Sequence, residues 1–383
     1  MIYLDHAAAT PVSAKVLSAM LLYFTDDFFN PSAAYLPAKK VHDDFERAKG
    51  VIAHFIGAKS NDLIITSGAT EANALAFTAL SETGKVLVLS TEHSSVLENA
   101  RRYPFETIKV NESGLIDLED LAAKLTDDVE LISVSLANNE LGTIQPLSKI
   151  AELIKKTKLS RLERGITTPL FLHSDASQGL ALLDVNVARL GVDLLTLNAA
   201  KISGPKGVGA LYVSHDVRLR PLVLGGGQER GLRAGTENVA GVVGFATAVA
   251  KIENSVANCK KYHKLRSILR SELVLAQLPP VFLGDEKHQL ANFLPVSFPG
   301  LDAERLIYKL EDRAVYVSTG AACAASKGEP SHVLQAIGLS PVEIAGSLRL
   351  SLGVLNDEEN VRTAGKIIRE VVDAEYERVR NRA

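Results

Sequence analysis

Short apolar runs alternate with helix-like stretches between about residues 62 and 213 of this 383-residue chain. Five of the runs have the length and composition of strands, and they cover residues 63–66, 86–89, 131–135, 170–172 and 194–197. Fully apolar strands separated by helical segments are typical of a mostly parallel sheet with helices on both faces. The pattern therefore predicts an α/β fold.

Polar residues directly follow each of the five predicted strands. They occupy positions 67–70, 91–93, 138–140, 174–175 and 198–201. In a parallel sheet the ligand crevice lies outside the carboxyl ends of the strands. We therefore expect these five strand ends to converge on one site, although they are far apart in the sequence.

The pattern changes after about Gly241, where a long helical stretch to Leu278 is followed by a compact C-terminal segment. We predict a large domain of residues 15–260. A smaller α+β domain would contain residues 1–14 and 261–383. Its last helix is expected to follow Asn356 as the N-cap, with Glu359 at the capping-box position.

Composition narrows the functional classes. A hydrophobic content of 46% and a charged content of 23% are ordinary for a globular protein. The net charge of −3 includes no block of like charge, so we expect binding to neither nucleic acid nor membrane. No segment is apolar over the roughly 20 residues of a membrane span, and the N-terminus lacks signal-peptide features, so we expect a cytoplasmic protein. Two cysteines are too few for a disulfide scaffold or a four-thiolate zinc site, and no metal site is predicted.

Lys201 and Asp175 each stand at the end of an apolar strand. A lysine in that position can form an imine, and a buried acid can hold a pyridinium nitrogen, which are the two groups that pyridoxal phosphate (PLP) requires of a protein. Lys206 is the competing lysine, but its place in a turn disfavours it. The glycines at 204, 207 and 209 precede a strand rather than a helix, so a nicotinamide cofactor is not predicted.

Residues 67–73 follow a strand and open a helix, so their free backbone N–H groups and the helix dipole suit a phosphate. An ordinary N-cap by Ser67 or Thr70 is the alternative, and the motif alone would favour it. The presence of Lys201 and Asp175 shifts the balance toward a phosphate site.

Four other polar residues are candidates for the same site. His93 could stack over a ring or move protons, or it could be a plain loop histidine. Asn139 and Gln178 could donate hydrogen bonds to the phenolic oxygen of the cofactor. Arg349 alternates with apolar residues and so projects from one face of a strand, where its planar fork suits an α-carboxylate. A surface ion pair is the competing interpretation of Arg349.

Cys323 lies in a run of small residues at about 318–330. Such a run lacks the bulk to pack firmly, so we expect a mobile loop that can carry a thiol between two positions. A buried, inert cysteine is the alternative, but the surroundings are not typical of a core. Cys259, beside two lysines on a predicted helix, has no expected role.

In combination, these segments resemble the cysteine desulfurases, which are PLP enzymes of the class V aminotransferase group, and specifically the branch with a long cysteine loop. The matching motifs are residues 3–11, 30–32, 66–71, 92–93, 138–142, 175–178, 201–209 and 233–238, with Cys323 and Arg349. The resemblance implies the PLP-transferase fold of aminotransferase type I. Its large domain has a mostly parallel seven-stranded sheet between helices, and a smaller α+β C-terminal domain carries the cysteine loop.

The resemblance also implies a role for each candidate. Lys201 would be the imine lysine, Cys323 the nucleophile, and His93 the acid–base group that stacks on the ring. The remaining cofactor contacts would be Asp175 at the pyridinium, Gln178 and Asn139 at the phenolate, Ala69, Thr70 and Asn198 at the phosphate, and Thr236 at the phosphate of the neighbouring subunit. Asn30 and Arg349 would hold the substrate carboxylate.

The implied function is conversion of L-cysteine to L-alanine, with the sulfur transferred as a persulfide on Cys323. The sulfur would serve iron–sulfur cluster assembly, another sulfur-containing cofactor or tRNA thiolation. The implied partners are a second copy of the chain, in a homodimer with shared active sites, and a sulfur-acceptor or iron–sulfur scaffold protein. Selenocysteine lyase or class V aminotransferase activity, for which Cys323 would be dispensable, is the alternative.

One departure from the family pattern lies just before Lys201. The family usually has a serine and a histidine two residues apart there, both on the phosphate, whereas this chain has Asn198 and Ala200. Asn198 can still donate a hydrogen bond. Losing one donor to a charged acceptor, worth on the order of 1 kcal/mol, should loosen the cofactor. A weakly active sulfur-relay or assembly partner is therefore a third hypothesis, although Lys201 and Asp175 argue against it.

Overall fold

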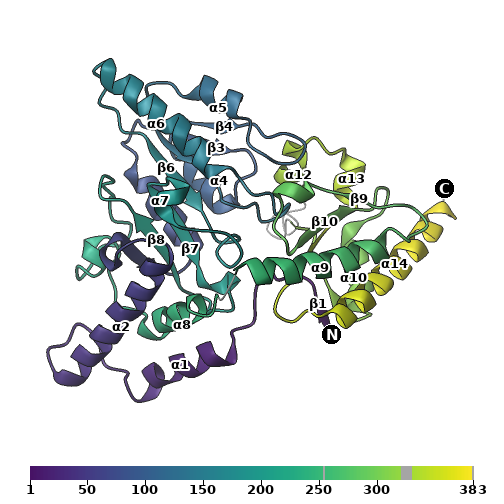
Figure 1. Ribbon diagram of the computed structural model, residues 1–383, viewed down its shortest axis with the longest axis horizontal. Helices are drawn as coiled ribbons and strands as arrows, with labels where there is room; N and C mark the ends of the chain where they lie inside the picture. Colours follow the sequence, from purple (N-terminus) through teal and green to yellow (C-terminus); the bar gives the residue numbers. More distant parts are fainter. Residues whose placement is uncertain (253–254, 321–329, 382–383) are drawn as a thin grey trace.

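The computed structural model describes residues 1–252, 255–320 and 330–381 (Figure 1). Its largest sheet has seven strands in the order β2-β8-β7-β6-β5-β3-β4. The strands are β2 (Leu63–Thr66), β3 (Lys85–Leu89), β4 (Phe105–Ile108), β5 (Val129–Ser133), β6 (Phe171–Asp175), β7 (Leu194–Asn198) and β8 (Gly209–Val213). In this sheet β8 runs antiparallel to both of its neighbours, β2 and β7, and the other adjacent strands pair in parallel. The predicted α/β fold with a mostly parallel seven-stranded sheet is confirmed.

Alternate residues of each strand pack against helices on opposite faces of this sheet. Ile64 and Val88 belong to one apolar cluster with α3 (Ala69–Ala76) and α4 (Ser94–Ala100). Their neighbours Ile65 and Leu87 belong to the main core with the other helices of this region. Those helices are α1 (Ala14–Thr25), α2 (Leu36–Phe55), α5 (Leu118–Lys124), α6 (Leu147–Glu163), α7 (Val187–Leu190) and α8 (Val239–Val249). Burial on both faces explains why the five predicted strands are largely apolar.

A second apolar core lies under the C-terminal part of the chain. Its three-stranded antiparallel sheet has the order β12-β10-β9, from β9 (Val281–Phe282), β10 (Phe293–Ser297) and β12 (Ser347–Ser351). The covering helices are α9 (Ser255–Leu273), α10 (Ala303–Glu311) and α14 (Glu358–Arg380), whereas α12 (His332–Ala336) and α13 (Pro341–Ala345) pack in a separate small apolar cluster with Leu141 and Leu283. The N-terminal strand β1 (Ile2–Tyr3) pairs with β11 (Val315–Tyr316) on this side, so both ends of the chain belong to this part of the molecule (Figure 1). The domain limits at about residues 14 and 260 stay a prediction.

Two helix predictions need correction. The long stretch from Gly241 to Leu278 forms two helices, because α8 packs on α1 and α2 in the main core whereas α9 packs on α14 in the second. The last helix begins one residue later than predicted, with Asp357 as its N-cap. The Asn356 side chain instead accepts a hydrogen bond from the Gly353 amide at 2.8 Å.

Short 3₁₀ turns connect several of these elements: η1 (Ser60–Asp62), η2 (Phe77–Ala79), η3 (Ala199–Lys201), η4 (Glu229–Gly231) and η5 (Glu286–His288). Within the described ranges, no helix combines the length and apolar character that a membrane crossing requires.

Candidate active site

Lys201 stands on the 3₁₀ turn η3, which continues directly from the end of β7. The Ala200 amide donates to Asn198 Oδ1 at 3.1 Å, and the Thr10 hydroxyl donates to the Ala200 carbonyl at 2.8 Å. The Ser203 amide in turn donates to the Thr10 hydroxyl at 2.8 Å. The turn that carries Lys201 is therefore fixed by its own strand end and by the N-terminal segment.

The N-terminal segment also brings Lys201 and Gln178 together. Lys201 Nζ donates to the carbonyl oxygens of Ala7 and Ala8 at 2.8 and 2.7 Å. Gln178 Nε2 donates to the same Ala7 carbonyl at 3.0 Å. Two strand ends that are far apart in the sequence thus meet on one backbone oxygen.

Asp175 ends β6, near the middle of the sheet, and is only 8% exposed. Its Oδ2 accepts from Asn73 Nδ2 at 2.8 Å, and its Oδ1 accepts from the Ser177 amide at 2.9 Å. Two donors hold the carboxylate in place, and each oxygen retains a lone pair for a further donor.

His173 lies two residues before Asp175 on the same strand and is fully buried. Its ring nitrogens contact the hydroxyls of Ser133 at 2.8 Å and Thr196 at 3.1 Å. Burial lowers the pKa of His173 to about 4, although the Asp175 carboxylate opposes this effect. The imidazole is therefore neutral near pH 7 and does not neutralise Asp175.

His93 is the N-cap of α4 and joins the same cluster. Its Nδ1 accepts from the Ser95 amide at 3.1 Å and lies 2.8 Å from the Ser95 hydroxyl. Burial is the main cause that lowers the pKa of His93, and the charges of Lys201 and His332 lower it further, against an opposing effect of Asp175. A neutral ring with one proton available for exchange is the result.

The N-terminus of α3 is shaped to receive an anion. Gly68 precedes the helix with φ 149°, and a Cβ built there would meet no atom within 4 Å. The first helical hydrogen bond runs from the Ala72 amide to the Gly68 carbonyl, so the amides of Ala69 and Thr70 lie ahead of it. Glycine at position 209 lets β8 pass close to the Gly68 backbone, because a Cβ on Gly209 would lie 2.8 Å from it.

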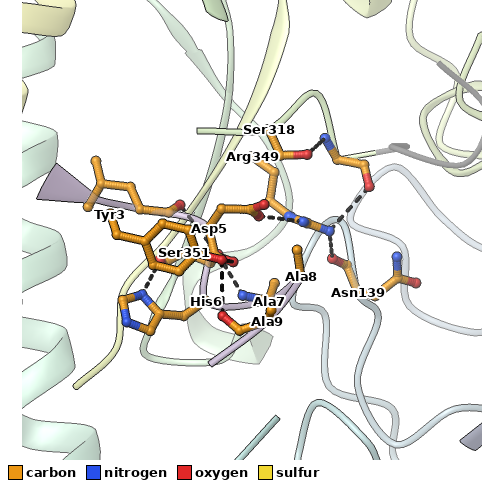
Figure 2. Close-up of polar contacts among 12 residues, drawn as sticks. Tyr3, Asp5, His6, Ala7, Ala8, Ala9, Asn139, Ser318, Arg349 and Ser351 are labelled. Atoms are coloured by element: carbon orange, nitrogen blue, oxygen red, sulfur yellow. Dashed lines mark hydrogen bonds and ion pairs between the residues drawn. The ribbon is translucent and has the colours of Figure 1, made fainter. Parts of the chain in front are cut away.

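Arg349 on β12 is only 4% exposed and forms a buried cluster with Asp5 (Figure 2). Its Nη2 donates to Asp5 Oδ1 at 2.6 Å, and its Nη1 donates to the carbonyl oxygens of Asn139 at 2.9 Å and Gly320 at 3.2 Å. The buried Nε has no hydrogen-bond partner among the described residues. The arginine is therefore an interior group and not half of a surface ion pair, which was the competing interpretation.

Comparison with known proteins identifies the family. The class-V aminotransferase model matches residues 2–363. The chain belongs to the class-V aminotransferase family. A cysteine desulfurase IscS from Clostridium botulinum is 36% identical, with 97% of this chain and 94% of the relative covered.

Solved structures agree with this assignment. A NifS-like protein superimposes with a TM-score of 0.88 at 32% identity, covering 97% of this chain and 99% of the other. SspA in complex with cysteine superimposes with a TM-score of 0.78 at 32% identity, with coverages of 92% and 99%. The predicted PLP-transferase fold and the resemblance to the cysteine desulfurases are confirmed at this level.

The residues of this class-V aminotransferase fit PLP. The open N-terminus of α3 suits its phosphate, and Asp175 offers a buried carboxylate to its ring nitrogen. Lys201 Nζ is held by the backbone carbonyls of Ala7 and Ala8. When bound, PLP supplies an electron sink for negative charge at the substrate α-carbon.

Some predicted residues are not joined to this cluster. Asn30 is exposed, and its side chain accepts from the Ser32 amide at 2.9 Å. Thr236 is exposed and lines a cavity of about 170 Å³ together with Ser67 and Gly207. Thr70 is also exposed. Neither Asn30 nor Thr236 makes a described side-chain contact with Lys201 or Arg349.

The two cysteines differ in what the structure says of them. Cys323 lies outside the described residues. On the two sides of Cys323 in the sequence, the Gly320 carbonyl accepts from Arg349 and the Ser331 hydroxyl donates to the buried Glu140 carboxylate at 2.6 Å. Cys259 is half-buried, and burial raises the pKa of its thiol. It is therefore mostly a thiol at neutral pH.

The sequence reasoning missed three residues that contact the cluster. Asn73 and Ser95 connect Asp175 to His93, and Asp5 holds Arg349. A signal existed for Asn73, because a polar residue on the buried face of a short helix needs buried partners. Asp5 and Ser95 gave no such signal, because short polar residues at strand and helix ends are common caps.

Proposed function

We propose that this class-V aminotransferase is a cysteine desulfurase that converts L-cysteine to L-alanine and passes the sulfur on as a persulfide of Cys323. The observation that carries the proposal is the meeting of Lys201, Asp175 and His93 at the ends of three strands or the turns that follow them. The named activity of the Clostridium botulinum relative and the cysteine in complex with SspA support this substrate.

Each cofactor-binding residue has a part that follows from its chemistry. Asp175 would accept a hydrogen bond from the protonated ring nitrogen and so keep the ring positively charged, and Gln178 and Asn139 would donate to the phenolic oxygen. The amides of Ala69 and Thr70 would bind the phosphate, with the Asn198 amide group as a further donor. Asn198 already uses its oxygen to cap the η3 turn, so only its nitrogen remains for this purpose.

Two groups would move protons. Lys201 would anchor the cofactor and, once released, take the substrate α-proton on Nζ and return protons to the product carbon. His93 would exchange a proton at Nε2, because Nδ1 is occupied by Ser95. In the neutral ring the proton lies on Nε2, so His93 would first donate that proton and then take one back at the same nitrogen.

Arg349 would bind the substrate carboxylate. Two of its N–H donors are engaged by the carbonyls of Asn139 and Gly320, and one by Asp5. The Nε, which has no hydrogen-bond partner in the described part of the chain, and the second hydrogen of Nη2 are left for a carboxylate oxygen. Asn30 would hold the same carboxylate together with Arg349, as the family resemblance implies.

The sulfur step balances without an external oxidant. The Cys323 thiolate attacks the substrate sulfur, an S–S bond forms, and the C–S bond breaks with its electron pair left on carbon. A proton then replaces sulfur on that carbon, so one L-cysteine and one thiol give one L-alanine and one persulfide. A thiol reductant would release the terminal sulfur as sulfide.

A homodimer with shared active sites is part of the proposal. Apolar side chains are exposed on α1 and in the segment that follows it: Leu17, Leu21, Phe24, Phe28, Tyr35 and Leu36 are each at least half exposed. An apolar surface of this kind is typical of a subunit interface. Thr236 would reach the phosphate in the partner subunit, and a sulfur-acceptor or iron–sulfur scaffold protein would receive the sulfur.

The deciding experiment is incubation of the PLP-loaded protein with L-cysteine and dithiothreitol, with alanine and sulfide measured together. Equal amounts of both products are expected. Cys323→Ser should abolish sulfide while cysteine still changes the visible spectrum, with Cys259→Ser as the matched control that retains activity. Keto-acid-dependent amino transfer would favour the aminotransferase alternative, and selenide release from selenocysteine without Cys323 would favour the lyase. A protein that cannot be loaded with PLP would instead indicate a sulfur-relay partner.

A further inference from the structure

Asn73 lies at the centre of a hydrogen-bond chain between Asp175 and His93. It is fully buried on α3, and its Nδ2 donates to Asp175 Oδ2 at 2.8 Å and to the Ser95 hydroxyl at 2.9 Å. Its Oδ1 has no hydrogen-bond partner within the described part of the chain. The orientation of the amide is therefore set by Asp175, because an ionised carboxylate can only accept.

This orientation fixes the direction of the next hydrogen bond. The Ser95 hydroxyl accepts from Asn73, so its own proton is free to be donated, and His93 Nδ1 lies 2.8 Å away. The Ser95 amide points to the same nitrogen at 3.1 Å. Two donors directed at Nδ1 require that this nitrogen carries no proton, which leaves the proton of the neutral ring on Nε2.

We propose that Asn73 and Ser95 are positioning residues that orient His93, hold its proton on Nε2 and connect the ring to the Asp175 carboxylate. The inference deepens the proposed function, and it rests on that function only for the acid–base role of His93. Protonation of Nδ1 would place its N–H against the N–H of the Ser95 amide. The hydrogen-bond chain from Asp175 through Asn73 and Ser95 to His93, called the relay below, therefore favours the neutral ring. The charged or titratable groups that face His93 from neighbouring elements are Asp175 on β6, Lys201 on η3 and His332 on α12.

Histidine-labelled protein tests the relay directly by NMR. The ring signals of the PLP-loaded parent and of Ser95→Ala and Ser95→Thr would be followed against pH, and His93→Gln would assign the His93 signal among the nine histidines. Ser95→Ala removes the hydroxyl donor to the neutral ring, so the His93 titration midpoint should rise by about 0.7 pH unit. Ser95→Thr retains the hydroxyl and should return the midpoint to the parent value.

Ser94→Ala is the matched control, since it removes a hydroxyl from the same helical turn without touching the relay, and its midpoint should equal that of the parent. An unchanged midpoint in Ser95→Ala would overturn the proposal, and so would equal shifts in Ser95→Ala and Ser95→Thr. In the desulfurase assay the acid limb of kcat/KM should move with the midpoint. A shift in the NMR titration of a protein that makes no alanine would retain the relay and reject the desulfurase assignment.

Discussion

Replacing Glu92 by glutamine should make thermal stability less sensitive to alkaline pH. Glu92 is fully buried beside the site, its Oε1 accepts from the Ser135 amide at 2.5 Å, and its Oε2 has no hydrogen-bond partner among the described residues. Burial raises the pKa of Glu92 from 4.5 to about 8; the Ser135 hydrogen bond opposes this, and the Asp175 carboxylate adds to it. The native protein thus keeps a proton on Glu92 at neutral pH.

The sign and size of the effect follow from linkage. The unfolded chain releases this proton near pH 4.5 and the folded chain near pH 8, so the contribution of Glu92 is complete below pH 4.5 and is lost as the pH rises to about 8. Each pKa unit corresponds to about 1.4 kcal/mol, so the parent should lose about 3 kcal/mol relative to Glu92→Gln between pH 6 and pH 9. With about 2.1 cal/mol/K of unfolding entropy for each residue, this loss equals about 3–4 °C in Tm.

The measurement is a set of melting curves for the parent, Glu92→Gln and Glu112→Gln at pH 6, 7, 8 and 9. Glu112 is exposed, so its variant should differ from the parent by the same amount at every pH. Glutamine resembles the protonated acid and does not titrate. The Tm of Glu92→Gln relative to that of the parent should therefore increase as the pH rises from 6 to 9. A difference that stays constant from pH 6 to pH 9 would refute a protonated Glu92.

Two further predictions concern buried ion pairs. Asp5→Asn leaves Arg349 without its counter-charge, so the free protein should lose about 1–3 kcal/mol of stability. L-Alanine should then raise the Tm of this variant more than the Tm of the parent or of the exposed control Asp43→Asn. An equal rise in all three proteins would contradict the carboxylate role of Arg349. Lys49→Met leaves the Glu229 carboxylate buried and unpaired, so urea unfolding should show a loss of about 3–5 kcal/mol that Lys49→Met/Glu229→Gln largely restores. If Lys49→Met is as stable as the parent, Lys49 and Glu229 do not form a buried ion pair.

Periodicity predicted most of the large sheet because its strands are buried on both faces. The five predicted strands are present, and β8 was also expected from the apolar run after Gly209. The edge strand β4 was missed, since three of its four residues are exposed and only Ile108 is buried. The break between α8 and α9 was missed for a different reason, because it depends on two separate cores that no local pattern reveals.

For the site, the sequence predicted the strand ends but not the groups that hold them. Lys201 and Asp175 follow from strand termination alone. The carbonyls of Ala7 and Ala8 could not be predicted, because any residue supplies a backbone oxygen. Asp5 likewise becomes a partner of Arg349 only after two segments 344 residues apart have met.

The N-terminal segment therefore contributes to the assembly of the site as well as to the second core. Ala7 accepts from Lys201 and Gln178 through its carbonyl, and its own amide donates to the Ser351 hydroxyl at 2.9 Å on β12. The same short segment thus touches residues that follow two strands of the large sheet and also β12, the strand that carries Arg349. Figure 2 shows its contacts with Ser351 and Arg349. Because each of these contacts is long-range, the lysine and the arginine reach their relative positions only when both cores are formed and joined. The site is thus expected to be lost as a unit when either core unfolds.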